Sequence, residues 1–89
     1  MIQKTLTIHN KLGLHARPAS EFVQLAANYQ SNVMLIKDDF EVNGKSILSV
    51  LMLAAEKGSV ITIKADGPDE NNAIKILGEF LQGKMDEIQ

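Results

Sequence analysis

The sequence predicts an α+β fold, in which an antiparallel sheet of four strands is covered on one face by three helices. The predicted elements follow one another in the order β-α-β-β-α-β-α. Strands and helices both carry apolar residues on one face only, which is typical of a sheet with helices packed on one side. At 89 residues, the whole chain, 1–89, is expected to form a single domain with one modest core.

The first strand is predicted over residues 3–9, where polar and apolar residues alternate. After a loop with Asn and Gly, residues 16–28 place apolar side chains at the spacing of one buried helical face. Pro18 is compatible with the first turn of this helix, because its missing N–H would have no helical partner there. The helix must therefore begin just before Pro18, which puts His15 at or next to the N-cap.

The middle of the chain predicts a hairpin and a second helix. Residues 33–37 and 40–42 alternate as strands around a turn with two aspartates. Ser46 is a good N-cap for a helix over residues 47–55, which is expected to end near Gly58.

The last strand is predicted over residues 60–65, and the turn after it leads to the last helix. Asp69 is a candidate cap for this helix, and Gly83 is expected to end it. The acidic tail to Gln89 is expected to be loose. The buried stripe of the last helix comprises Ala73, Ile74, Leu77, Phe80 and Leu81.

Composition excludes several classes of function. Nine Lys and Arg stand against 11 Asp and Glu, a net charge of −2, with one Tyr and no Trp, which disfavours nucleic-acid binding. The absence of cysteine and the presence of only two histidines make a metal site improbable. The longest apolar run, residues 50–55, is too short to insert into a membrane, and the N-terminus has no signal-peptide pattern. We therefore expect a cytoplasmic protein.

His15 and Arg17 form the first candidate site. A helix start presents unpaired N–H groups and the positive end of the helix dipole, which together attract anions. A neutral imidazole there can take a phosphoryl group on one ring nitrogen, with Arg17 available for charge-assisted hydrogen bonds. The alternative is a histidine that merely caps the helix. Because a first-turn cation costs about 0.3–1 kcal/mol, the presence of Arg17 favours an anion at this position.

Ser46 and the apolar helix after it form a second candidate site. An N-cap role, worth about 1 kcal/mol, is sufficient to explain Ser46, and regulatory phosphorylation is the functional alternative. The helix is too apolar to have a single buried face, so most of it is expected to be core. An exposed docking patch is the alternative for part of it. The candidates for this patch are Ile47, Leu48 and Leu51.

Residues 13–19 have the sequence GLHARPA. This segment resembles the active-site signature of the HPr family, the histidine phosphocarriers of bacterial sugar phosphotransferase systems. Residues 43–47, NGKSI, are similar to the regulatory serine segment of that family, and the resemblance covers essentially the whole chain. It implies an HPr-like domain with an open-faced β-sandwich of four antiparallel strands and three helices. It also implies a stoichiometric phosphocarrier, without a cofactor, rather than an enzyme.

The resemblance implies a role for each candidate residue. His15 would accept a phosphoryl group from phosphorylated enzyme I and pass it to a sugar-specific enzyme IIA, and Arg17 would assist the transfer. Ser46 matches the serine phosphorylated by the ATP-dependent HPr kinase/phosphorylase. The family's hydrophobic docking surface is matched by Ile47, Leu48 and Leu51. We expect the carrier to be a monomer.

The alternative is a regulatory binding module, in which phosphorylation of Ser46 controls docking to a transcriptional regulator or an enzyme. Position 54 holds Ala54, where Gram-positive members of the resembled family typically have glycine, and residues 10–13, NKLG, are similar to its nitrogen-related branch. The output could then be nitrogen-type or carbon-catabolite regulation instead of sugar uptake. An intact His15 weighs against an exclusively regulatory role.

Overall fold

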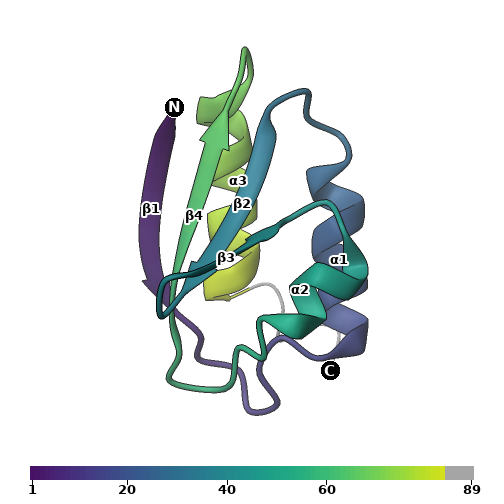
Figure 1. Ribbon diagram of the computed structural model, residues 1–89, viewed down its shortest axis with the longest axis vertical. Coiled ribbons are helices and arrows are strands. Elements are labelled where there is room, and N and C mark those ends of the chain that lie inside the picture. Colours follow the sequence, from purple (N-terminus) through teal and green to yellow (C-terminus); the bar gives the residue numbers. More distant parts are fainter. Residues whose placement is uncertain (84–89) are drawn as a thin grey trace.

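The computed structural model describes residues 1–83 and contains the elements in the predicted order (Figure 1). The strands are β1 (Ile2–Thr7), β2 (Asn32–Lys37), β3 (Phe40–Asn43) and β4 (Val60–Asp66). The helices are α1 (Ala16–Ala26), α2 (Ile47–Met52) and α3 (Glu70–Gln82). The tail that the sequence predicts to be loose, residues 84–89, lies outside the described residues.

The strands form one sheet in the order β1-β4-β2-β3, and all neighbouring pairs are antiparallel. The register brings Leu6 opposite Ile61 and Leu35 opposite Ile63, so that the apolar residues of neighbouring strands lie in rows on one face. On the opposite face, the hydroxyls of Thr5 and Thr62 form a hydrogen bond of 3.0 Å across β1 and β4. The predicted four-stranded antiparallel sheet is confirmed.

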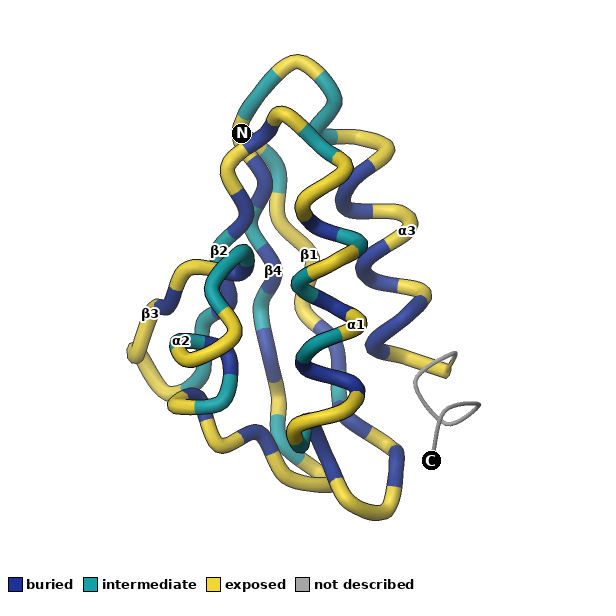
Figure 2. Tube along the Cα trace, turned by 90° about the vertical axis from the view of Figure 1, so that its right-hand side faces the viewer, coloured by how far each residue is buried: buried dark blue, intermediate teal, exposed yellow. Residues whose placement is uncertain are grey.

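All three helices lie on the apolar face of the sheet, as Figure 1 and Figure 2 show from two directions. Helix α3 contacts β1 and β4, α1 contacts both α3 and α2, and α2 contacts β3. The other face of the sheet is left uncovered by helices. The predicted architecture, with helices on one face only, is therefore confirmed.

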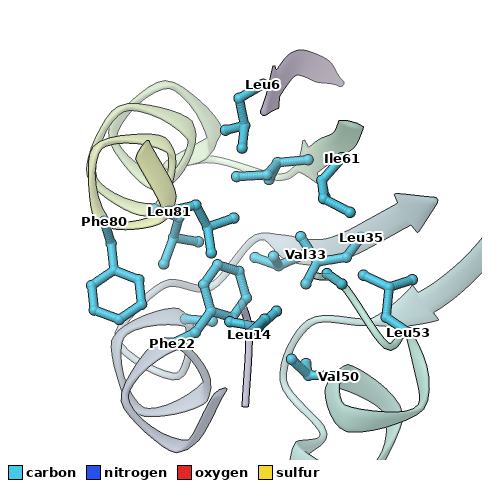
Figure 3. Packing of buried hydrophobic residues seen from close by; sticks show 14 of the residues in the cluster. Leu6, Leu14, Phe22, Val33, Leu35, Val50, Leu53, Ile61, Phe80 and Leu81 are labelled. Atoms are coloured by element: carbon cyan, nitrogen blue, oxygen red, sulfur yellow. The ribbon is translucent and has the colours of Figure 1, made fainter. Parts of the chain in front are cut away.

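The core forms between α1, α3 and the inward face of the sheet. Phe22 of α1 is completely buried, and its ring lies 6.4 Å from that of Phe80 in α3, tilted by 47°. Figure 3 shows Phe22 among side chains of the helices and the strands, with Val33 and Leu35 among those from β2. Such ring pairs add about 0.5–1.5 kcal/mol beyond the burial of their area.

Helix α2 ends at Met52, and the predicted end near Gly58 is wrong. Leu53 and Ala55 are both buried, at 3% and 4% exposure. Residues two apart on a helix point to nearly opposite sides, so a continued helix could not bury both. The chain turns instead at Ala54, whose φ of 54° lies in the left-handed region. The other boundary differences are smaller: β1 ends at Thr7 and α1 at Ala26, two residues before the predicted ends.

Asp69 occupies the N-cap position of α3, but the prediction that its side chain caps this helix is wrong. The carboxylate accepts hydrogen bonds from the Ser31 hydroxyl at 2.5 Å, the Ser31 N–H at 3.0 Å and the Gln30 N–H at 2.9 Å. It thereby ties the start of α3 to the chain just before β2. These bonds, with that of the Ser31 hydroxyl first, hold the pKa of Asp69 below its usual value.

Replacing Asp69 with asparagine is expected to make stability less dependent on pH. A carboxyl whose pKa is lower in the folded than in the unfolded chain stabilises the fold fully above the unfolded value, roughly pH 4. That stabilisation is lost as pH falls through the folded-state pKa. Melting curves followed by circular dichroism should therefore show a Tm deficit for Asp69→Asn at pH 7 that shrinks below about pH 4. Glu79→Gln, an exposed change on α3, is the control. A deficit that is constant with pH would contradict this role for the carboxylate.

Candidate functional site

His15 is the N-cap of α1, as predicted. Its backbone is extended, with φ −84° and ψ −170°, and its carbonyl accepts the N–H of Ala19 at 2.9 Å. The imidazole makes no capping hydrogen bond to the helix. The backbone of His15 thus starts the helix, while its side chain is left available for another task.

The first turn of α1 provides donors for an anion. The N–H groups of Ala16 and Arg17 have no preceding carbonyl of the helix to bond to, and Pro18 has no N–H. The first turn contains no acidic residue. Arg17 is exposed and forms no salt bridge within residues 1–83. An anion beside His15 would therefore meet two backbone donors and a guanidinium that is not neutralised by an acidic neighbour in the described chain.

The two ring nitrogens of His15 are not equivalent. His15 is half-buried, and its Nε2 atom is buried without a hydrogen-bond partner among residues 1–83. A reacting group from outside the molecule cannot reach a buried nitrogen without moving the ring. Of the two nitrogens, Nδ1 is therefore the one that a group from outside the molecule could reach.

The loop that carries His15 is held at both ends. The side-chain amide of Asn10 donates from Nδ2 to the carbonyl of Gly13 at 2.6 Å, and the N–H of Gly13 donates to the carbonyl of Asn10 at 3.2 Å. Next along the chain, the N–H of Leu14 donates to the carbonyl of Ala55 at 2.8 Å, and the Leu14 side chain is buried. The residues after α2 therefore position the backbone immediately before His15, a long-range support that local sequence patterns do not reveal.

Ser46 caps α2, as predicted. Its backbone is extended and its hydroxyl oxygen accepts the N–H of Ser49, at a long distance of 3.4 Å. The N–H of Ser46 donates to the carbonyl of Asn43 at 3.2 Å. Ser46 is half-buried at the start of a short helix. Its single capping bond is weak, because 3.4 Å is longer than the usual hydrogen-bond distance.

The expectation that most of α2 is core is wrong. Within the helix only Val50 is buried. A helix of six residues makes fewer than two turns, so the side that faces the core holds very few side chains. Leu48 is 71% exposed and Ile47 is also exposed, whereas Leu51 is half-buried against the core. Met52, at 67% exposure, was not among the predicted docking residues. Met52 follows Leu48 by four residues, and this spacing puts both side chains on one face of a helix. That spacing was the sequence signal that Met52 belongs with the exposed residues.

A cavity of about 290 Å³ lies against residues of β2, β3 and β4, including Met34, Asn43 and Lys64, and His15 does not line it. Within residues 1–83, no three histidine, cysteine or acidic side chains are grouped so that they could hold a metal ion. No helix in the same part of the chain is long and apolar enough to cross a membrane. His15 lies where the loop meets the start of α1, two residues before the exposed Arg17.

Comparison with known proteins agrees with these observations. Residues 2–83 match the PTS-HPr family model, described as the PTS HPr component phosphorylation site. Phosphocarrier protein HPr of Neisseria meningitidis is 45% identical over 87 residues, which are 98% of each chain. A crystal structure of HPr from Thermoanaerobacter tengcongensis matches with a TM-score of 0.88 and 43% identity, over 91% of each chain.

A second kind of relative is also similar. HPr-like protein Crh of Bacillus subtilis is 42% identical over 85 residues, which are 96% of this chain and all of Crh. A crystal structure of Crh, described as a dimer with a swapping domain, matches with a TM-score of 0.75 and 38% identity, over 97% of each chain.

Proposed function

The chain belongs to the HPr family of the phosphotransferase system, whose members are phosphocarriers and not enzymes, and we propose that His15 carries its phosphoryl group. The observation that carries this proposal is the state of the imidazole at the start of α1. It makes no capping bond, and one of its nitrogens is buried while the first-turn donors lie beside it. The match over residues 2–83 supports a single HPr-like domain for the chain.

The transfer follows from the chemistry of the ring. The lone pair of His15 Nδ1 attacks the phosphorus of the phosphoryl group on the donor, forming an N–P bond as the bond from phosphorus to the donor breaks. The bonding electrons leave with the donor, and the ring proton remains on Nε2. The phosphoryl oxygens then accept hydrogen bonds from the N–H groups of Ala16 and Arg17 and from the Arg17 guanidinium. The reverse attack, by a nucleophile of the acceptor, removes the group.

The proposed donor is phosphorylated enzyme I and the proposed acceptor is a sugar-specific enzyme IIA, with the exchange taking place in the cytoplasm. Partner docking is assigned to the exposed apolar residues of α2, Ile47 and Leu48, with Met52 on the same surface and Leu51 at its base. Two different proteins must reach the same histidine, and an apolar patch suits both, because burial of apolar area is non-directional. We propose a monomeric carrier, which size-exclusion chromatography distinguishes from a dimer of the kind described for Crh.

The decisive experiment is phosphorylation with purified enzyme I and phosphoenolpyruvate. We expect the protein to gain one phosphoryl group, labile to acid, and peptide mapping under alkaline conditions should place it on the peptide that contains His15. A reaction without enzyme I is the control and should leave the mass unchanged. An acid-stable modification, or acid-labile phosphate on another residue, would contradict the proposal.

Regulation through Ser46 is a separate part of the proposal. A phosphoryl group on Ser46 would place about two negative charges beside the exposed side chains of Ile47 and Leu48, where an apolar partner surface would have to desolvate them. We expect HPr kinase/phosphorylase and ATP to modify wild type but not Ser46→Ala, with acid-stable phosphate as the readout. Ser49→Ala, one turn later in the helix, is the matched control and should remain a substrate. If the kinase leaves Ser46 unmodified, this part fails while the carrier function stands.

The similarity to Crh supports the regulatory alternative, in which the protein acts only by docking. The free imidazole at the start of α1 favours the carrier function instead, because docking alone does not require a nucleophile beside anion donors. Transfer from phosphorylated His15 to an enzyme IIA separates the two, since a purely regulatory module would not pass the group on.

A further inference from the structure

Two buried polar atoms in the loop before α1 lack hydrogen-bond partners among residues 1–83. They are the side-chain oxygen Oδ1 of Asn10, a residue with 3% exposure, and Nε2 of His15. A buried polar atom without a partner destabilises the fold, and such atoms are rare, so a pair of them within six residues calls for an explanation.

The two atoms are chemically complementary. The Nδ2 group of Asn10 donates to the Gly13 carbonyl, and turning the amide over would set two oxygens against each other, so the unpartnered atom is the oxygen, an acceptor. When Nδ1 of His15 has its lone pair free for attack, Nε2 carries the ring proton and is a donor. A donor and an acceptor therefore remain unsatisfied in the same short loop.

We infer that Asn10 is a positioning residue for phosphoryl transfer, whose Oδ1 accepts the Nε2–H of His15 when the ring carries the phosphoryl group. This inference rests on the proposed function of His15. In the structure the two atoms are not hydrogen-bonded to each other. Phosphorylation at Nδ1 leaves the proton on Nε2 and gives the ring a positive charge, and hydrogen bonds from charged donors are roughly twice as strong as neutral ones. The phosphorylated ring thus gains most from Asn10.

The surrounding contacts suit this role. The Asn10 side chain is buried and is held by its hydrogen bond to the Gly13 carbonyl. Leu14, the residue before His15, is held by the carbonyl of Ala55, so the backbone on this side of His15 is fixed to the fold. The imidazole has no capping bond to break before it turns toward Asn10. Pairing would also hold the ring proton on Nε2 while Nδ1 carries the phosphoryl group.

Two substitutions of similar size separate the acceptor from the loop anchor. Asn10→Leu and Asn10→Asp both lose the amide donor to Gly13, but only aspartate keeps an acceptor. We expect phosphorylated Asn10→Leu to lose its phosphoryl group by hydrolysis about tenfold faster than wild type, the effect of one hydrogen bond. Asn10→Asp should stay within about threefold of wild type. In ¹⁵N spectra of the phosphorylated proteins, the Nε2–H resonance of His15 should differ from that of wild type in Asn10→Leu only.

Equal hydrolysis rates for the two variants would overturn the inference, because the loop anchor would then account for the whole effect. A measurement on wild type covers the case in which a variant does not fold. The side-chain carbonyl ¹³C resonance of Asn10 should move downfield on phosphorylation, as expected for an acceptor that gains a hydrogen bond, and an unmoved resonance would also overturn the inference. Failure of the proposed function itself would look different, since wild type would then carry no phosphate on His15.

Discussion

Replacing His15 with alanine is expected to remove all acid-labile phosphate from protein incubated with enzyme I and phosphoenolpyruvate. The reason is chemical: the substitution removes the nucleophile and leaves the anion donors of α1 in place. Because the imidazole makes no capping bond, the variant should fold with a Tm close to that of wild type. Loss of phosphorylation would then report the missing nitrogen and not a damaged helix.

His9→Ala is the matched control for this experiment. His9 is the only other histidine of the chain, and its side chain is exposed just beyond the end of β1. This variant should accept phosphate at the wild-type rate. Acid-labile phosphate that persists in His15→Ala, or is lost in His9→Ala, would show that the carrier histidine has been misassigned.

Gly13→Ala is expected to destabilise the protein by about 2–5 kcal/mol. Gly13 has a φ of 69°, which costs an alanine about 1–2 kcal/mol by itself. A Cβ there would also overlap the backbone carbonyl of Ala55 and lie 2.8 Å from Cα of Glu56, so that one of the two segments must move. For a domain of this size, each 1 kcal/mol lowers Tm by about 4–8 °C, which thermal unfolding measures easily.

Gly58→Ala separates the two causes of that loss. Gly58 also has a positive φ, 91°, but nothing lies within 4 Å of the position a Cβ would take. Its alanine variant should lose only the conformational part, about 1–2 kcal/mol. In Gly13→Ala, the displacement of either segment would also strain the hydrogen bond from the Leu14 N–H to the Ala55 carbonyl. Phosphorylation by enzyme I should therefore slow as well. Equal stability of the two variants would mean that the close approach of the two segments is not important.

Local patterns were sufficient for much of the fold. Alternation in β4 puts Ile61, Ile63 and Ala65 on the same face of the strand, and all three are buried. Alternation and helical spacing depend on which residues leave water, and this preference is a property of each short segment. Pro18 fixed the predicted start of α1 to within about one residue of the observed start, because proline is tolerated in the first turn of a helix but not in the turns after it.

Patterns failed where a distant partner decides the outcome. The length of α2 depends on burying both Leu53 and Ala55, and the side chain of Asp69 turns to Ser31, which lies 38 positions earlier. The exposure of Met52 follows from the orientation of a short helix against β3. Each of these outcomes is a choice between local preferences that differ by about 1 kcal/mol, and tertiary contacts outweigh such differences.

The sequence by itself determined the order of the elements, the sheet with helices on one face, and the position of His15 at a helix start, because apolar spacing and proline stereochemistry act within a few residues. Only the tertiary structure decided that Nε2 of His15 is buried, that Asn10 keeps an unused acceptor, and that the carbonyl of Ala55 holds the loop. Those properties arise where the loop before α1 meets the residues after α2, segments some 40 residues apart whose contact no local pattern encodes.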